Sequence, residues 1–160
     1  LCREGGLGND MIGIIFALKE EFREFLSHLA RYESSHDEET GRTFYEFVFP
    51  LDSPGGEAKF KCAATFIGAM GETQAAIVTD NLLRRYDPET VVVVGLAGAL
   101  DKELKIGDVV VPNLVDAYLE NAKAAPGDRA GEFKFLLSGE PYRTSVDWAR
   151  AADHVEFSNR

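Results

Sequence analysis

Two adjacent carboxylates, Glu20 and Glu21, stand where an apolar stretch passes into a helical pattern near the start of the chain. They follow residues 11–17, Met-Ile-Gly-Ile-Ile-Phe-Ala, whose apolar run is typical of a buried strand. Ligands of open α/β sheets bind at the carboxyl ends of strands, where a carboxylate can take a proton from water as a general base. Acidic residues are equally favoured in the first turn of any helix by its dipole. The residues alone leave both interpretations open.

Small residues follow two further apolar stretches. Residues 91–98, Val-Val-Val-Val-Gly-Leu-Ala-Gly, pass from a β-branched run into small residues that let a backbone approach a ligand or another strand closely. Residues 68–71, Gly-Ala-Met-Gly, separate a strand pattern from a helical one. They could present backbone N–H groups to an anion or a ribose, or they could simply form a tight turn. We therefore predict the edge of a pocket after the strand near 91–95, without a defined chemistry.

Other site chemistries find little support. The histidines His28, His36 and His154 have no suitably spaced Cys or His partner, so no metal site is predicted. No serine lies in a Gly-X-Ser-X-Gly setting, and neither a dinucleotide fingerprint nor a P-loop is present, so no cofactor is predicted. The two cysteines, Cys2 and Cys62, do not suggest a disulfide framework, which favours a reducing cytoplasm.

The bulk composition narrows the class of partner. The chain has 160 residues, 45% of them hydrophobic, and a formal net charge of -10. Nucleic acids and anionic membranes require a basic face, so neither is a predicted partner. No apolar run approaches the roughly 20 residues of a membrane span, and no signal-peptide pattern is present. A small metabolite bound largely by backbone groups remains compatible with this charge.

Hydrophobic periodicity predicts the elements that would position these residues. We expect a three-layer α/β/α sandwich with a central mixed, mostly parallel sheet. The strands are predicted near 11–17, 43–49, 57–67, 91–95 and 107–112, and the helices near 19–32 and 72–86. Weaker patterns suggest loops at 33–42 and 120–132, a short strand at 133–137 and a helix at 144–153.

The start of the chain suggests additional sequence outside the domain. The first residue is Leu1, whereas Met11 directly precedes the first strand pattern. Residues 1–10 are therefore expected to be a tag remnant or the tail of an upstream segment, and residues 11–160 to form one domain.

Three segments together resemble one family. Residues 11–22, MIGIIFALKEEF, resemble the amino-terminal strand and helix of the methylthioadenosine/S-adenosylhomocysteine nucleosidases, which belong to the nucleoside phosphorylase superfamily. Residues 70–76, MGETQAA, are similar to that family's turn and following helix. Residues 91–111, VVVVGLAGALDKELKIGDVVV, resemble its glycine-rich block and are the most specific match. The segments come in family order over residues 11–112.

The resemblance implies cleavage of the N-glycosidic bond of a purine nucleoside or nucleotide, most simply of adenine type. Glu21 aligns with the glutamate that activates the attacking water. The implied substrate-binding positions are Ala17, Leu18, Met70, Leu96, Ala97 and Gly98. We expect Glu21, Met70 and the segment Leu96 to Gly98 to converge at one end of the sheet. The phosphorylases of the superfamily carry Gly-Asp-Pro and an arginine for phosphate after the first strand, where this chain has Phe16-Ala17-Leu18-Lys19, so the resemblance favours hydrolysis over phosphorolysis.

The sequence departs from the family pattern in ways that bear on activity. Phe16 replaces a usual glycine, and Ala99 replaces the second glycine of a pair. Family members exceed 200 residues, and their later half supplies a Met-Glu that holds the ribose and a Ser-Asp that protonates the purine. Neither motif occurs at 113–160, so we expect a domain truncated on its carboxyl side. The alternative is a catalytically incomplete nucleoside-binding or assembly module on the same fold.

Two further expectations come from resemblance. Residues 109–123 resemble nucleosidase effector domains of bacterial defence proteins, which would suit a domain cut from a longer chain. The superfamily commonly forms dimers or hexamers, so a homo-oligomer is expected.

Overall fold

The computed structural model describes most of the chain in two compact units, one ending at Gly98 and one beginning at Ala99. The described residues are 11–53, 56–69, 71–117, 123–129, 131–136 and 139–158. Residues 1–10, which the sequence suggests are a tag remnant or an upstream tail, lie outside the described residues.

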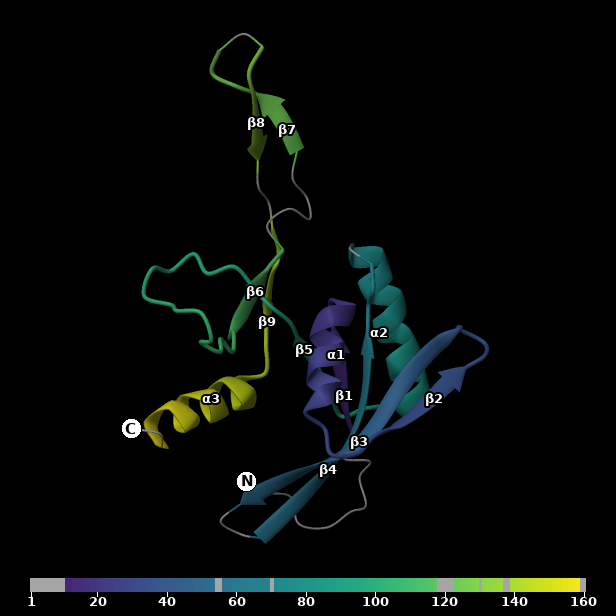
Figure 1. Cartoon of the computed structure of the whole chain (residues 1–160). Coiled ribbons are helices and arrows are strands. Elements are labelled where there is room, and N and C mark those ends of the chain that lie inside the picture. The colour runs from purple at the N-terminus through teal and green to yellow at the C-terminus, as the bar shows by residue number, and fades with distance from the viewer. Residues whose placement is uncertain are drawn as a thin grey trace. The chain divides into compact units, whose positions relative to one another are not determined.

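A five-stranded sheet in the order β2-β3-β4-β1-β5 forms the centre of the first unit (Figure 1). Its strands are β1 (Met11–Phe16), β2 (Glu33–Asp37), β3 (Arg42–Ser53), β4 (Gly56–Phe66) and β5 (Thr90–Val94). β1 pairs in parallel with both β4 and β5, whereas β3 pairs antiparallel with β2 and β4. The predicted mixed sheet is confirmed, with its parallel strands grouped around β1. Because these three strands run in the same direction, their carboxyl ends meet at one edge.

Two helices cover opposite faces of this sheet, α1 (Lys19–Ser27) and α2 (Glu72–Tyr86). Successive side chains of a strand point to opposite faces, and β1 follows this rule. Ile15 belongs to the core cluster that includes Val78 and Leu82 of α2. Phe16 belongs to the cluster that includes Phe22 of α1. The helix–sheet–helix arrangement confirms the predicted three-layer class.

The two helices approach the sheet by different means. On one face, Gly13 leaves room for α2, since a Cβ at this position would lie 2.7 Å from Cδ2 of Leu82. On the other face, the ring of Phe22 packs 5.3 Å from that of Phe16 and 5.4 Å from that of Phe66, measured between centroids. These contacts fix α1 above the carboxyl ends of β1 and β4, which determines where its first turn lies.

The second unit contains short elements. β6 (Leu114–Asp116) pairs antiparallel with β9 (Pro141–Arg143), and β7 (Lys123–Pro126) pairs antiparallel with β8 (Phe133–Leu136). The helix α3 (Val146–Ser158) follows β9. The predicted strand at 133–137 and helix at 144–153 correspond to β8 and α3, whereas the predicted loop at 120–132 contains β7.

Three predicted elements of the first part of the chain need correction. Residues 33–42 contain a strand, β2, because their backbone pairs with β3 even though the sequence Glu-Ser-Ser-His-Asp is polar. Residues 107–112 form no strand, since Gly107 has a φ of 100° and no ladder partner is present among the described residues. α1 ends at Ser27 rather than near 32. Directly after Ser27, the N–H groups of His28 and Leu29 donate to the carbonyls of Phe25 and Leu26, three residues earlier, and not four as in an α-helix.

Candidate functional site

The first turn of α1 directs a carboxylate back toward the end of β1. Leu18 precedes the helix in an extended conformation, with φ -113° and ψ 149°. Its backbone N–H donates a hydrogen bond of 3.0 Å to Oε2 of Glu21, the third helical residue. This bond is one half of a capping box, and the other half is not formed because the side chain of Leu18 has no acceptor. It gives an acidic residue at this position a structural role, in addition to the interaction with the helix dipole considered from the sequence.

The second oxygen of Glu21 makes a contact that a helix start does not require. Oε1 accepts a hydrogen bond of 2.8 Å from the backbone N–H of Leu96, which is 75 positions later in the chain. Leu96 lies two residues beyond the end of β5, and β5 is the parallel neighbour of β1. Each carboxylate oxygen therefore accepts one backbone N–H, and each keeps acceptor capacity for a further donor such as water.

Gly95 allows this approach. A Cβ built on Gly95 would lie 3.4 Å from both carboxylate oxygens of Glu21 and 3.7 Å from the carboxylate carbon. The carboxylate thus rests directly against the backbone at the end of β5. Sequence reasoning recognised Gly95 only as the end of a strand pattern. The available signal was its position immediately after a β-branched run, which identifies a close approach but not the group that approaches.

The third parallel strand brings its end to the same edge. The N–H of Ile67, directly after β4, donates to the carbonyl of Phe16 at 2.8 Å, and that of Gly68 donates to the carbonyl of Ala17 at 3.4 Å. The segments that follow β1, β4 and β5 are consequently adjacent. Backbone groups at the ends of three strands and the carboxylate of Glu21 are thus brought together from positions far apart in the sequence.

The structure brings together most of the predicted site. Ala17 and Leu18 lie beside Glu21 after β1, and Leu96 contacts it directly. Ala97 and Gly98 continue from Leu96 without helix or strand structure. The side chain of Leu18 is 47% exposed and that of Leu96 is 89% exposed. Met70, the remaining predicted residue, lies outside the described residues.

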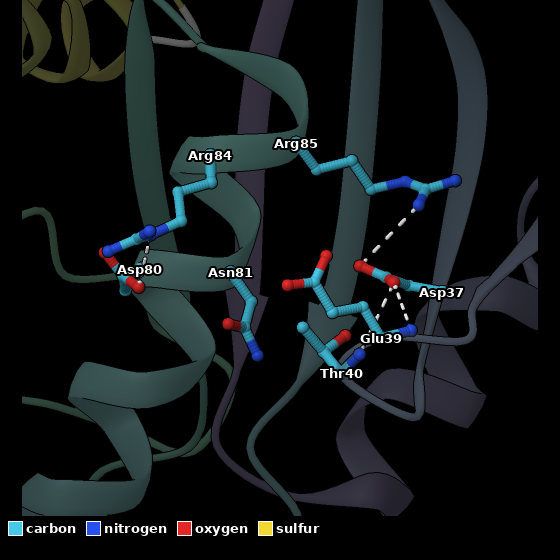
Figure 2. A pocket seen from close by; sticks show the side chains of 7 residues that line it. All are labelled: Asp37, Glu39, Thr40, Asp80, Asn81, Arg84 and Arg85. Carbon is cyan, nitrogen blue, oxygen red and sulfur yellow. Dashed lines mark hydrogen bonds and ion pairs between the residues drawn. The ribbon is translucent and has the colours of Figure 1, made fainter.

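Two cavities of the first unit are formed by other residues. One, of about 360 Å³, lies between the β2–β3 turn and α2 (Figure 2) and is lined by Asp37, Glu39, Thr40, Asp80, Asn81, Arg84 and Arg85. A larger one, of about 910 Å³, is lined mainly by residues of β3 and of the segment after α1, together with Met11 at the amino end of β1. Neither is lined by Glu21 or Leu96.

Four charged side chains of the smaller cavity form two ion pairs. Arg84 bonds to Asp80 at 2.7 Å, and the Arg85 guanidinium lies 3.7 Å from the carboxylate of Asp37. Desolvation raises the pKa of Asp37, but hydrogen bonds from Thr40 and Glu39 and the charge of Arg85 together hold that pKa below its ordinary value. The Arg85–Asp37 pair joins α2 to the β2–β3 turn, and the hydrogen bonds to Asp37 from the backbone of Glu39 and Thr40 hold the turn together (dashed lines in Figure 2).

The described residues contain neither a cluster of metal-binding side chains nor a membrane-spanning helix. Within the described ranges, no three His, Cys, Asp or Glu side chains gather as a metal ion would need. No described helix combines the length and apolar character needed to cross a membrane.

Comparison with known proteins identifies relatives. A family model described as the phosphorylase superfamily matches residues 11–156, across both units. A 5'-methylthioadenosine/S-adenosylhomocysteine nucleosidase from Staphylococcus epidermidis is 32% identical over 117 residues, which cover 71% of this chain and 45% of the relative. The chain therefore spans about half the length of the curated relatives it matches.

Solved structures agree with this assignment. S-adenosylhomocysteine nucleosidase from Streptococcus pyogenes, in complex with 5-methylthiotubericidin, superposes with a TM-score of 0.65 at 25% identity, covering 98% of this chain and 60% of that one. Native futalosine hydrolase from Helicobacter pylori superposes with a TM-score of 0.64 at 21% identity, covering 94% of this chain and 59% of that one, and supports the fold.

Proposed function

Because this chain belongs to the phosphorylase superfamily, we propose that it is the part of a purine nucleosidase that carries the water-activating base, Glu21. The reaction is hydrolysis of the N-glycosidic bond of a purine nucleoside or nucleotide. The observation that carries the proposal is the hydrogen bond from Leu96 N–H to Glu21, since it holds an acceptor at the common end of three parallel strands. In α/β sheets this edge is where ligands bind.

The proposed substrate is an adenine nucleoside. The names of the Staphylococcus and Streptococcus relatives refer to methylthioadenosine and S-adenosylhomocysteine, and the latter structure holds 5-methylthiotubericidin. A nucleoside also suits the net charge of -10 better than nucleic acid does. We place the ribose and purine along Leu96, Ala97 and Gly98, with Ala17, Leu18 and Met70 on the ribose side, following the family resemblance.

The chemistry requires one base and one acid. In the proposed reaction, Glu21 accepts a proton from water as the water oxygen attacks C1′ of the ribose. The N-glycosidic bond breaks, its electron pair stays on the purine nitrogen, and the purine takes up a proton. Both oxygens of Glu21 accept one N–H each and retain capacity for the water, which supports the role of base.

The family motif that would supply the acid for the purine is not found in the second part of this chain. The Ser-Asp motif that would supply it is absent from residues 113–160, as is the Met-Glu motif for the ribose. We therefore propose that full activity needs further sequence, as expected for a domain truncated on its carboxyl side. The homo-oligomer and the cytoplasmic location expected from the sequence stay part of the proposal.

A second candidate is a nucleoside-binding or assembly module that does not turn over its ligand. The exposure of Leu96, at 89%, favours it, since efficient hydrolysis requires a site that excludes bulk water. Adenine release and nucleoside binding, measured side by side on a panel of adenosine, 5′-thioether adenosines and adenine nucleotides, distinguish the candidates. Release supports the nucleosidase, and binding without release by the native protein that carries this chain supports the module.

A further inference from the structure

We infer that Gly95 is a positioning residue for Glu21, because side-chain atoms beyond Cβ at position 95 would compete with the carboxylate for the place where it lies against the end of β5 and bonds to Leu96. The inference rests on the proposed role of Glu21 as the base and extends it to a residue that the family resemblance does not assign. It concerns the placement of the base and not contact with the substrate.

The backbone conformation of Gly95 does not require a glycine, so its role must lie in what surrounds it. Five described glycines have a positive φ, namely Gly41, Gly68, Gly71, Gly107 and Gly131, and Gly95 is not among them. Its backbone conformation is therefore open to other residues. A Cβ would be in ordinary van der Waals contact with both oxygens of Glu21, at 3.4 Å, so the space beyond a Cβ is where the carboxylate limits the side chain.

A larger side chain at position 95 should displace the Glu21 carboxylate more. The Cβ of an alanine would touch the carboxylate at the limit of ordinary contact and cover the side of the oxygens that faces β5. The additional methyl groups of a valine would need space that the carboxylate occupies. Valine suits an extended backbone, and residues 91–94 of β5 are all valine, so the strand itself tolerates this change.

Among the described residues, loss of the Leu96 bond would leave Glu21 with the hydrogen bond from Leu18, three residues before it. The carboxylate would then be an ordinary helix-start acid, free to turn away from the end of β5. A displacement of about 1 Å in a reacting group can lower a rate by about 10²-fold. The Gly95–Leu96 peptide therefore converts a helix-capping acid into one fixed at the end of the sheet.

Kinetics on the native protein that carries this chain test the inference. We expect Gly95→Ala to change kcat by less than about 3-fold and Gly95→Val to lower it about 10²-fold, with KM changed by less than about 3-fold in both. In a Glu21→Gln background the same changes should lower the residual rate no further, since both act through one group. An unchanged kcat in Gly95→Val, or an equal loss in the Glu21→Gln background, would overturn the inference.

A second measurement does not depend on hydrolysis and uses the 160-residue chain. In ¹⁵N–¹H correlation spectra, Glu21→Gln should move the Leu96 amide resonance, because the bond from this N–H to the carboxylate is altered, whereas Glu20→Gln should leave the resonance in place. When Glu21→Gln is introduced into Gly95→Val, it should move the Leu96 resonance much less than in the unmodified chain. A Leu96 amide that does not respond to Glu21 overturns the inference even if the protein releases adenine. If the amide responds and Glu21→Gln keeps full activity, the contact exists but Glu21 is not the base. The proposed function then fails, and the positioning role of Gly95 in the reaction fails with it.

Discussion

Oε1 of Glu21 lies 2.8 Å from the backbone nitrogen of Leu96, across 75 positions of the sequence. This bond joins two patterns that are separate in the chain, an acidic residue at a helix start and small residues after a buried strand. The parallel pairing of β1 with β5 brings them together, since Phe16 and Val94 at the two strand ends are register partners. The candidate site is therefore a property of the sheet topology.

The packing of α2 on β1 predicts a stability defect. A Cβ at Gly13 would lie 2.7 Å from Cδ2 of Leu82, which is fully buried, so Gly13→Ala overpacks the core. We expect a loss of about 1–3 kcal/mol in the free energy of unfolding. Urea denaturation followed by circular dichroism measures it. Gly98→Ala is the matched control, because a Cβ there meets nothing within 4 Å; equal stability of the two variants would contradict the packing described.

From the environment of Tyr86 we expect the free energy of unfolding to decrease at alkaline pH. Burial, followed by the hydrogen bond of 2.7 Å that its hydroxyl donates to Glu46, raises the pKa of Tyr86 from 10.0 to about 12. The neutral phenol is thus favoured in the folded state, and its contribution is complete below pH 10 and lost as pH rises toward 12.

The difference in unfolding free energy between the unmodified chain and Tyr86→Phe measures this contribution. It should be constant from pH 7 to 9 and should shrink between about pH 10 and 12. A difference that grows over the alkaline range would mean that the folded state favours the ionised phenol, contrary to the environment described.

The environment of Cys62 predicts a protected thiol. Its side chain is 3% exposed, and burial raises the pKa of the thiol. Thiolate is the reactive form, so modification must await local or global opening. In a Cys2→Ser background, iodoacetamide should label Cys62 at least about 100-fold more slowly in buffer than in denaturing urea. Comparable rates in the two solvents would exclude the buried position.

Hydrophobic periodicity was sufficient to predict the helices and strands in which apolar residues repeat regularly. The bounds predicted for α2, residues 72–86, agree with the structure, because the chain leaves the helix at Asp87, which has a φ of 43°, before Pro88. β2 could not be recognised in the same way, since its polar sequence is stabilised by a backbone ladder with β3. Residues 107–112 show the opposite case, in which β-branched residues suit a strand but have no partner among the described residues.

The family resemblance predicted that Glu21 and Leu96 lie at the same end of the sheet, but the sequence did not predict the contact of Glu21 with Gly95. Glu21 and Leu96 were both candidates from their sequence settings and the family resemblance. The role of Gly95 depends on a side chain from α1 that reaches it only after β1 and β5 have paired. No local pattern encodes that distance, so the contact becomes visible only in three dimensions.

Adenine release by three forms of the native protein that carries this chain tests the central claim most directly. The forms are the unmodified protein, Glu21→Gln and Glu20→Gln. Glutamine keeps the size of the side chain and removes its basicity, so Glu21→Gln should lower kcat by about 10²–10⁴-fold while nucleoside binding is largely retained. Glu20 is exposed and adjacent to Glu21 in the first turn of α1, and Glu20→Gln should retain the unmodified rate. Turnover by Glu21→Gln equal to that of the unmodified protein would contradict the account and leave Glu21 as a helix-start acid alone.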